Sequence, residues 1–437
     1  MKYSIYNNTV KLANGFELLY NAMSDRFLAI KGNAVGNIVS HSANDLKSAN
    51  RKLYDDIKSI GGIVDDDKNE VDDLDKMIKS IDNNDSNFIL HINPTLDCNF
   101  RCWYCYENHV KRSKMSSYMV ENTKKLIRNI ICSQKNLKTM QVSFFGGEPL
   151  LHFNSVAREI MLFAKLEAER HAVKLCFHFT TNAFMLNEKM FSFFKDFDVS
   201  FQITIDGDCE QHDKTRFCHN GTGSYHTIVK NIKALARQGH SVIARINYTA
   251  SNISGVWKVI EDIGSCEEEA KQHIRIDLQQ VWQDAKNNAD TIGPYLLSIT
   301  SQAREAGLAI TSCKTFDRVR NGCYGDKRNH AVINYNGDVF NCTARDFIHE
   351  NRSGYVSDNG SIVYENDALN RRMKAKFSKP VCHKCTIAPI CGGGCAQKAI
   401  ENINYNGCIY GMDKERIEKV ILDRFEYKFI PQQAQRA

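Results

Sequence analysis

The sequence predicts an α/β protein whose centre is a parallel β-sheet, and three observations support this fold class. Strand-like runs alternate with amphipathic helical stretches across residues 86–310, and such alternation is typical of parallel β/α architecture. The residues before this region alternate apolar and polar positions, and those after it form short, cysteine-rich segments. With 437 residues the chain is longer than one hydrophobic core usually organises, so we expect several domains.

A small N-terminal α+β domain is predicted for residues 1–85. Residues 1–62 alternate apolar and polar side chains around the turn signal Ala13-Asn14-Gly15, which is the pattern of a hairpin followed by short helices. The stretch from Asp65 to Asp85 is acidic and poor in aromatic residues, as expected for a solvated helix or a linker. We therefore place a domain boundary there.

The central domain is predicted for residues 86–310 and contains six strand–helix units. Six such units can form a partial barrel or an open doubly wound sheet, and the periodicity does not decide between the two. Helical stretches at 116–132 and 154–168 are expected to pack outside the sheet, which leaves the carboxyl ends of the strands as the place for a site. The strand-like runs are residues 88–94, 140–145, 175–180, 199–205, 242–248 and 274–278.

Composition and charge exclude several classes of protein. Hydrophobic residues make up 43% of the chain and charged residues 25%, which is close to the globular average. Because no apolar run approaches the length of a membrane span, we expect no membrane partner and a cytoplasmic location. The formal charge of +6 is small and the basic residues are scattered, so nucleic acid is not an expected partner. In a reducing cytosol, sixteen cysteines indicate metal or cluster ligation rather than disulfides.

A loop with three cysteines follows the first predicted strand. Cys98, Cys102 and Cys105 are separated by three and two residues. A [4Fe–4S] cluster ordinarily takes four thiolates, so three of them on one loop leave one iron free to bind another molecule. A zinc site is the alternative, but it would need a fourth His or Cys close by, and His109 is the near candidate.

This loop, with Tyr104 before its last cysteine, resembles the defining motif of the radical S-adenosylmethionine (SAM) superfamily. The resemblance implies that the open iron chelates the amino and carboxylate groups of SAM. An electron from a donor such as flavodoxin or ferredoxin, passed through the cluster, would then cleave the sulfonium and yield a 5′-deoxyadenosyl radical. The resemblance also implies the partial (β/α)6 TIM-like barrel rather than the open sheet.

Residues at the ends of the next strands are similar to the SAM site of this superfamily. The glycine pair 146–147 allows close backbone approach to a ligand, and the resemblance implies that this pair and Glu148 contact the SAM amino group. It also implies that Thr204 hydrogen-bonds SAM and that Arg216 pairs with its carboxylate, because Arg suits planar oxyanions. The alternative is an ordinary strand residue for Thr204 and a solvated turn for Arg216. The expected SAM contacts are Tyr104, Gly146, Gly147, Glu148, Asn182, Thr204 and Arg216.

Residues 311–437 carry a second cysteine pattern, which resembles the seven-cysteine SPASM domain of radical SAM enzymes. The pattern is Cys323-x13-Gly337-x4-Cys342, then Cys382-x2-Cys385-x5-Cys391-x3-Cys395, then Cys408. Cys313 would complete eight ligands, enough for two auxiliary clusters and hence three [4Fe–4S] clusters in total. The resemblance implies two ligand sets, namely Cys313, Cys323, Cys342 and Cys395 for the first auxiliary cluster and Cys382, Cys385, Cys391 and Cys408 for the second.

Enzymes with this pair of domains mostly modify peptides or proteins, so the resemblance implies such a substrate. Sulfatase-maturing members place an Asp directly after the cysteine equivalent to Cys342, where it is the candidate proton acceptor, whereas this chain has Thr343. Asp338 and Asp346 are possible substitutes that nothing in the sequence favours. Formylglycine formation is therefore not the favoured reaction.

Residues 1–62 resemble the leader-recognition modules of peptide maturases, which add a leader strand to a sheet edge; a purely structural cap is the alternative. We therefore expect a maturase that forms a thioether or a carbon–carbon crosslink in a ribosomally synthesised precursor peptide with a leader. The other hypotheses are an anaerobic sulfatase-maturing enzyme, a non-peptide SPASM dehydrogenase and a non-enzymatic iron–sulfur or zinc scaffold. Five cysteines have no assigned role, and we expect most of them to be structural: Cys132, Cys176, Cys209, Cys218 and Cys266. Cys209 and Cys218 lie near the expected SAM site and are candidates for substrate contact.

Overall fold

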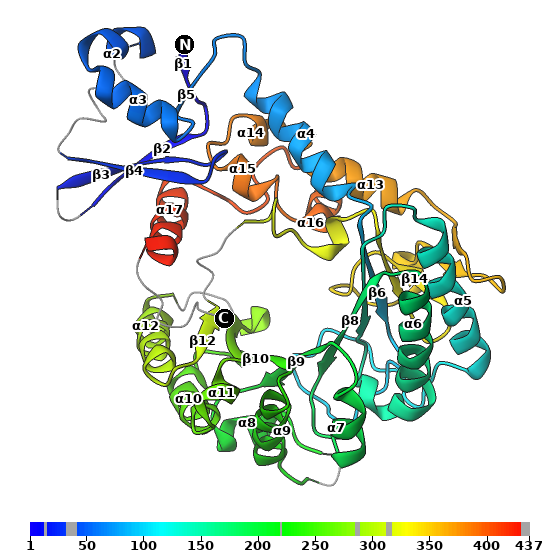
Figure 1. The fold of residues 1–437 in the computed structure, drawn as a ribbon. Coiled ribbons are helices and arrows are strands. Elements are labelled where there is room, and N and C mark those ends of the chain that lie inside the picture. The colour runs from blue at the N-terminus through cyan, green and yellow to red at the C-terminus, as the bar shows by residue number, and fades with distance from the viewer. Residues whose placement is uncertain (13–14, 32–41, 219–220, 285–288, 312–316, 430–437) are drawn as a thin grey trace. The chain divides into compact units, whose positions relative to one another are not determined.

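The computed structural model describes residues 1–12, 15–31, 42–218, 221–284, 289–311 and 317–429, which fold into two compact units (Figure 1). We call them the barrel unit and the terminal unit and describe each by itself. Within the described residues, the barrel unit comprises residues 85–311 and 329–367, with the gaps given above. The terminal unit comprises residues 1–84, 317–328 and 368–429, again with those gaps.

The barrel unit is built on a sheet of eleven strands in the order β12-β11-β10-β9-β8-β7-β6-β13-β14-β15-β16. Neighbouring strands from β6 to β12 are parallel, β13 is parallel to β6, and β14 to β16 continue as antiparallel strands. The strands are β6 (Asn87–Ile92), β7 (Thr139–Phe144), β8 (Lys174–Thr181), β9 (Val199–Ile205), β10 (Ser241–Tyr248), β11 (Ile274–Gln280), β12 (Ala309–Thr311), β13 (His330–Ile333), β14 (Asp338–Phe340), β15 (Gly354–Val356) and β16 (Ile362–Tyr364).

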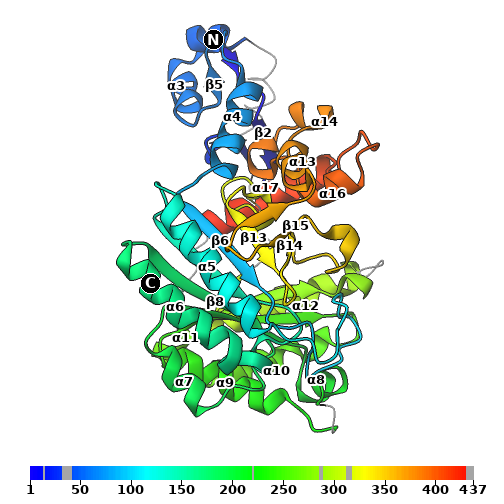
Figure 2. The ribbon, with the colours of Figure 1, turned by 90° about the vertical axis from the view of Figure 1, so that its right-hand side faces the viewer.

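The predicted α/β class and the six predicted strand-like runs are confirmed, the runs as β6 to β11. The strand β12 was not predicted, because three residues are too few to show an alternation of apolar and polar positions. The strand β13 lies beside β6 in the same sheet, so residues 329–367 belong to the barrel unit (Figure 2). The predicted functional domains, residues 1–85, 86–310 and 311–437, stay a prediction. The two units are defined only by which residues pack together, and packing does not define function.

Helices cover the apolar face of this sheet. In β9 the buried residues Val199, Phe201 and Ile203 alternate with the partly exposed Ser200 and Gln202, so one face is apolar and the other polar. The helices pack on the apolar face and share one hydrophobic core with it (Figure 1). They include α5 (Ser117–Ser133), α6 (Arg158–Arg170), α7 (Glu188–Phe194), α8 (Cys209–Thr215), α9 (Tyr225–Arg237), α10 (Val256–Gly264), α11 (Glu268–Lys271) and α12 (Ala289–Glu305).

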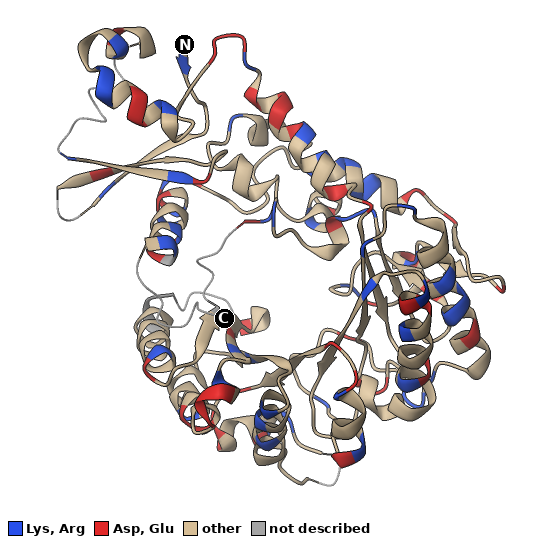
Figure 3. Cartoon of the chain, in the orientation of Figure 1, with Lys and Arg blue, Asp and Glu red and all other residues tan. Residues whose placement is uncertain are grey.

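The helix predicted at 116–132 is confirmed as α5, which begins after Ser116 because the Ser116 side chain caps the backbone N–H of Met119. The helix predicted at 154–168 is confirmed as α6, preceded by the π-helical turn η2 (Phe153–Ala157). Acidic and basic residues are interspersed along α5 and α6 (Figure 3), and ion pairs such as that between Arg128 and Glu167 join them. None of the helices that the structure describes is long and apolar enough to cross a membrane.

The terminal unit contains the predicted N-terminal hairpin, confirmed as β2 and β3, together with a third antiparallel strand β4 that was not predicted. Residues 13–14 of the predicted turn lie outside the described residues. The acidic stretch after residue 65 forms the helix α4. The predicted helix is thus present, but it is not fully exposed to solvent, because its residues Leu74 and Ile78 are buried in the core of the unit. The elements are β1 (Lys2–Tyr3), β2 (Asn7–Lys11), β3 (Phe16–Asn21), β4 (Arg26–Lys31), α2 (Ala43–Ala49), α3 (Arg51–Ser59), β5 (Ile63–Val64), α4 (Glu70–Asp82), α13 (Ala368–Ala375), α14 (Pro380–His383), α15 (Ala388–Cys391), α16 (Ala396–Glu401) and α17 (Lys414–Phe429).

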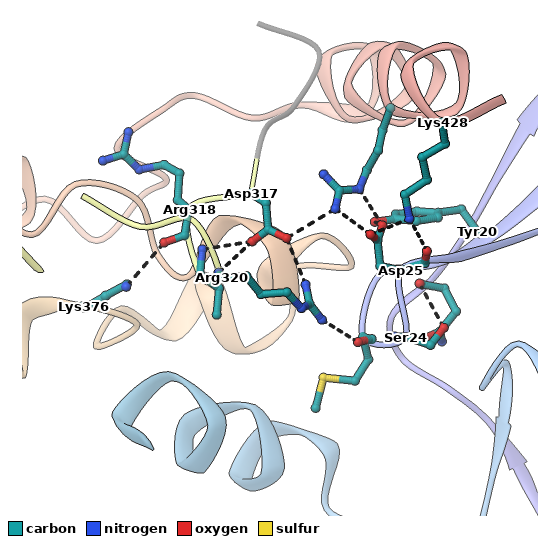
Figure 4. A network of polar contacts seen from close by, with 12 residues as sticks. Tyr20, Ser24, Asp25, Asp317, Arg318, Arg320, Lys376 and Lys428 are labelled. Atoms are coloured by element: carbon teal, nitrogen blue, oxygen red, sulfur yellow. Dashed lines mark hydrogen bonds and ion pairs between the residues drawn. The ribbon is translucent and has the colours of Figure 1, made fainter. Parts of the chain in front are cut away.

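A buried ionic network holds α17 against the β3–β4 turn in the terminal unit (Figure 4). The Arg424 guanidinium donates to both carboxylate oxygens of Asp25, at 2.5 and 2.7 Å, and to Asp317 at 3.3 Å. Lys428 adds a contact of 2.5 Å to Asp25, and Arg320 adds one of 3.1 Å to Asp317. Because these residues come from the first and last parts of the chain, the network ties the N-terminal sheet to the C-terminal helix.

Candidate SAM and iron–sulfur site

The three-cysteine loop lies between β6 and α5 and holds its thiols close together. Burial raises the pKa of the Cys98 thiol to about 12 and that of the Cys105 thiol to about 11, and the charge of Cys102 adds to both shifts. Burial also raises the pKa of Cys102. Three neighbouring thiolates are therefore unfavourable by themselves and need a soft cation such as iron to stabilise them. The residues fit a cluster in this respect.

The zinc alternative is not supported by this loop. His109 does lie close, with Nε2 3.5 Å from Cys105 Sγ, but its other ring nitrogen is 3.4 Å from the Arg101 guanidinium. No three His, Cys, Asp or Glu side chains converge as the ligands of a single ion anywhere in the described part of the chain. A four-iron cluster binds each thiolate to a different iron, so it does not require such convergence.

The glycine pair at the end of β7 lies directly against the cysteine loop. The Gly147 N–H donates to Thr95 O at 3.2 Å, and the next N–H donates to Asp97 O at 2.9 Å. A Cβ at Gly146 would lie 2.4 Å from Thr95 O, and a Cβ at Gly147 would lie 2.2 Å from Asp97 O. Gly146 also has φ +104°, which a residue with a side chain rarely adopts. Both glycines are therefore needed for the loop to pack on the sheet.

Glu148 is fully buried and braces the ends of β7 and β8. Its carboxylate accepts hydrogen bonds from the Leu150 N–H at 3.0 Å, the Thr181 hydroxyl at 2.6 Å and the Asn182 N–H at 2.8 Å. Burial raises its pKa, and these hydrogen bonds oppose the shift. The brace brings the Asn182 amide to 2.8 Å from Asn99 Oδ1 on the cysteine loop. Glu148 thus positions Asn182, and direct contact of Glu148 with SAM stays a prediction.

Asn182 is a predicted SAM contact that lies close to a proposed cluster thiol. Its side-chain nitrogen is 4.0 Å from Cys98 Sγ as well as hydrogen-bonded to the loop. Thr204 lies on the polar face of β9, half-buried and beside Arg245 of β10 in register. The ends of β7, β8 and β9 therefore bring the predicted glycine pair, Asn182 and Thr204 to the same edge of the sheet as the cysteine loop.

Tyr104 and Arg216 meet in a buried polar group that includes two residues the sequence analysis missed. The Tyr104 hydroxyl donates to Asp206 and accepts from the Arg216 guanidinium at 2.7 Å and from Asn247 at 3.2 Å. Arg216 is only 7% exposed, so the alternative of a solvated turn is wrong for it. Asp206 could have been found in the sequence as a carboxylate at a predicted strand end, whereas Asn247 carried no such signal.

This group contains buried atoms that lack a hydrogen-bond partner among the described residues, namely Asp206 Oδ1 and Arg216 Nε. Burial raises the pKa of Asp206 although Arg216 opposes the shift, and the two charged groups are 4.0 Å apart. Unsatisfied buried groups are costly and uncommon in proteins. A carboxylate and a guanidinium left short of partners beside the cysteine loop fit a ligand that has both an amino and a carboxylate group, as SAM has.

In the terminal unit, four of the predicted auxiliary ligands gather. Burial raises the pKa of Cys382 to about 11 and that of Cys391 to about 12, and the charges of Cys385 and Cys408 contribute to both. The turn between Cys391 and the next predicted ligand consists of three glycines with positive φ, and a Cβ on the middle one would lie 2.5 Å from the backbone of Phe377. This arrangement fits the second predicted auxiliary cluster.

The first predicted auxiliary set is only partly described by the structure. Burial works against the charge of Arg318, but nearby groups that include Cys395 and Cys323 together raise its pKa, so both thiols lie near this cation. Cys313 lies outside the described residues, and Cys342 belongs to the barrel unit. This ligand set therefore stays a prediction.

The unassigned cysteines form two contacts with histidines in the barrel unit. Cys209 Sγ is 3.5 Å from His226 Nε2, and Cys132 Sγ is 3.5 Å from His171 Nε2. Burial and the charge of Asp213 raise the pKa of both Cys209 and Cys218, so neither thiol is activated as a nucleophile.

Comparison with known proteins identifies the family of the chain. Residues 92–262, from the last residue of β6 to the end of α10, match the sequence profile of the radical SAM superfamily. The chain is a radical SAM enzyme. The enzyme accordingly uses SAM and a [4Fe–4S] cluster.

Two relatives illustrate the range of this radical SAM enzyme's similarity in sequence. It is 24% identical over 339 residues to the cysteine-type anaerobic sulfatase-maturating enzyme of Clostridium novyi (strain NT), covering 70% of this chain and 87% of the relative. It is 23% identical over 159 residues to the radical SAM cyclopropyl synthase TigE of Paramaledivibacter caminithermalis, covering 33% of this chain and 32% of TigE.

Two solved structures share its fold. The anaerobic sulfatase-maturating enzyme anSMEcpe with bound AdoMet aligns with a TM-score of 0.58 and 16% identity, covering 79% of this chain and 97% of anSMEcpe. Streptococcus suis SuiB bound to its precursor peptide SuiA aligns with a TM-score of 0.53 and 16% identity, covering 94% of this chain and 99% of SuiB.

Proposed function

We propose that this radical SAM enzyme is a peptide maturase that forms a thioether or a carbon–carbon crosslink in a ribosomally synthesised precursor peptide. The observation that carries the proposal is the extent of the structural likeness. The likeness to SuiB spans 94% of the chain, whereas that to anSMEcpe spans 79%. SuiB was solved with a precursor peptide bound, so a fold of this whole length is compatible with a substrate of that kind.

In this proposal Cys98, Cys102 and Cys105 hold the radical cluster. When bound, the cluster and SAM supply a carbon radical that removes a hydrogen atom from the substrate. The Arg216 guanidinium pairs with the SAM carboxylate, and its buried position excludes water from that contact. The remaining expected contacts orient the amino group and the ribose, with Asn182 held in place by the Glu148 brace: Tyr104, Gly146, Gly147, Glu148, Asn182 and Thr204.

The proposal includes two auxiliary clusters, which would accept the electron released when the substrate radical is oxidised. One is held by Cys382, Cys385, Cys391 and Cys408 and the other by Cys313, Cys323, Cys342 and Cys395. Three clusters predict about twelve irons per chain in anaerobically purified protein, whereas a protein with the radical cluster alone would hold about four. An iron content near four would contradict this part of the proposal.

The proposal also assigns leader binding to residues 1–85. In the described residues β4 is an edge strand of the N-terminal sheet, since its one strand partner is β3. An edge strand presents free backbone N–H and C=O groups, to which an extended leader can add as a further strand. If the N-terminal sheet is only a cap, the enzyme will bind the leader and the leaderless core peptide equally weakly.

The deciding experiment incubates the reconstituted enzyme with SAM, a reductant and the short peptide encoded beside its gene. We expect 5′-deoxyadenosine and a peptide that has lost two hydrogen atoms, with fragmentation linking two side chains. Replacing Cys98, Cys102 and Cys105 with Ala should abolish deoxyadenosine formation and leave auxiliary iron bound. Deoxyadenosine from that triple variant would refute the assignment of the radical cluster.

A sulfatase-maturating activity is the second candidate, favoured by the similarity to the Clostridium novyi enzyme over 87% of that relative. The buried Thr343 stands where the sequence comparison expects a proton-accepting Asp, and a hydroxyl is a poor base at neutral pH. A sulfatase-derived peptide that contains the target Cys or Ser discriminates between the two candidates. Formylglycine in that peptide, with no crosslink in the neighbouring peptide, would replace the present proposal.

A further inference from the structure

The hydroxyl of Tyr104, in the cysteine loop, makes every hydrogen bond of which a phenol is capable. It donates to Asp206, accepts from Arg216 Nη1 at 2.7 Å and accepts from Asn247 Nδ2 at 3.2 Å. A phenol has one donor and room for two acceptor bonds, so its capacity is filled. One side chain thus joins the loop to three other parts of the barrel unit.

The partners of Tyr104 are held by the sheet and by a second layer of hydrogen bonds. Asp206 follows the last residue of β9, and its N–H donates to His212 Nδ1 at 3.1 Å. His212 Nε2 is in turn 2.9 Å from the Ser224 hydroxyl, which binds the carbonyl of Arg216. Asn247 lies in β10, where it pairs with Gln279 of β11, and the residue before it in β10 pairs with Ile205 of β9. These partners are therefore held in place by the sheet and by this second layer, and Tyr104 fastens the loop to them.

The residues on either side of Tyr104 are the more exposed part of the cysteine loop. Trp103 is 60% exposed and Tyr106 is 40% exposed, and Cys105 is exposed as well. The backbone contributes the Cys105 N–H bond to Cys102 O at 3.1 Å and a bond of 2.9 Å from Gln283 to Tyr104 O. Tyr104 is thus a half-buried side chain between the exposed residues Trp103 and Cys105, and it lies between two of the three proposed cluster ligands.

We propose that the Tyr104 hydroxyl is a pin that fixes the positions of Cys102 and Cys105, and that Asn247 and Asp206 are positioning residues that hold this pin. The inference rests on the proposed cluster site. Because Arg216 Nη1 is bonded to the Tyr104 hydroxyl while Arg216 Nε has no hydrogen-bond partner among the described residues, the same guanidinium links the loop to the proposed SAM site. Order in the loop and affinity for SAM are therefore coupled through Arg216.

The test compares Tyr104→Phe and Asn247→Ala with a matched control, Tyr225→Phe. Tyr225 is a buried tyrosine of the barrel unit whose hydroxyl donates to a carboxylate, Asp262 of α10, at 2.7 Å. Its ring packs against His212 and is kept in Tyr225→Phe, so the substitution removes only a hydroxyl that bonds to α10 rather than to Tyr104 or its partners. Tryptic cleavage of the full-length apo-protein after Arg101, Lys111 and Arg112 reports the order of the loop without any cluster. On reconstituted protein, the dissociation constant of SAM and the electron paramagnetic resonance spectrum of the reduced cluster with SAM report the position of the cluster.

Both test variants should be cut in the loop about tenfold faster than the wild type and should bind SAM about tenfold more weakly. Tyr104→Phe takes a partner from a buried carboxylate and a buried guanidinium, and Asn247→Ala takes a donor from the Tyr104 hydroxyl. The change that SAM makes to the spectrum should also be altered in both, and Tyr225→Phe should match the wild type in all three measurements. Selective loss of the radical cluster's iron in Tyr104→Phe, with auxiliary iron retained, would equally support the pin. Wild-type cleavage rates and SAM affinity in both test variants would overturn it. If the wild-type enzyme fails to cleave SAM, the proposed function is wrong, but the cleavage rates of the apo-protein still decide the role of the pin.

Discussion

The two units each contain a buried arginine–aspartate network, and the two networks differ in completeness. In the terminal unit, both carboxylate oxygens of Asp25 receive hydrogen bonds from Arg424, and Lys428 adds another. In the barrel unit, Asp206 binds Tyr104 through one oxygen, and its other oxygen has no hydrogen-bond partner in the described residues. The first network is closed by the protein itself, and the second is left open beside the cysteine loop.

The electrostatics of the two carboxyl groups follow this difference. Burial alone would raise the pKa of Asp25, but Arg424 and Lys428 outweigh it and lower the pKa to about 2. Burial raises the pKa of Asp206 and prevails over Arg216. A closed network contributes to stability, whereas an open one costs stability until a ligand supplies the missing partners. The comparison therefore separates a structural network from a binding one without reference to the family.

The largest effect on stability is expected from opening the closed network. Arg424→Met leaves Asp25 and Asp317 with one cationic partner each, and we expect the free energy of unfolding to fall by about 3 kcal/mol. Urea unfolding measures this loss. The SAM affinity of the folded protein should not change. A weaker binding of SAM by Arg424→Met would show that the network in the terminal unit is not purely structural.

The second effect concerns the open network of the barrel unit, where the change is expected in SAM binding rather than in stability. Arg216→Met removes the guanidinium from the open network, and we expect SAM to bind about 100-fold more weakly, equivalent to about 2.7 kcal/mol. The urea midpoint should move less than in Arg424→Met, because Arg216 is short of partners before the ligand arrives. Unchanged SAM binding, measured by equilibrium dialysis, would contradict the assignment of Arg216.

The third effect is a pH dependence that belongs to the closed network. Because the pKa of Asp25 is lowered from 3.8 to about 2, its contribution to stability is present above pH 4 and is lost as the pH falls towards 2. The contribution is about 2 kcal/mol. Unfolding free energies of the wild type and Asp25→Asn across this range should converge at low pH. A constant difference between them would exclude the carboxylate as the cause.

The smallest effect on stability is expected from Asp206→Asn. The pKa of Asp206 is raised, so its ionised form opposes folding, and an amide oxygen can still accept from Tyr104. The unfolding midpoint should therefore not fall, although SAM should bind about tenfold more weakly because a neutral amide pairs less strongly than a carboxylate with the SAM amino group. A variant destabilised by more than 1 kcal/mol would place Asp206 with the structural networks.

Local patterns predicted much of the barrel unit. Three of the predicted runs, which became β8, β9 and β10, alternate buried and more exposed residues over five or more positions, and a sequence displays such a pattern directly. The cysteine spacings and the Gly146-Gly147 pair were visible for the same reason, since they depend on residues close in the chain. Arg216 was singled out through a resemblance, and its burial was not predicted, because burial depends on Asp206 and Tyr104 from distant segments.

The sequence by itself determined the class of the fold, the superfamily motif and the wealth of thiols available for clusters, because each is encoded in local composition or short spacing. Only the tertiary structure decided that β13 joins β6, that Glu148 braces Asn182, and that the hydroxyl of Tyr104 gathers Asp206, Arg216 and Asn247. The physical reason is that hydrogen bonds are satisfied in space rather than along the chain. Whether a buried charge is left open for a ligand can therefore be judged only when all its neighbours are known.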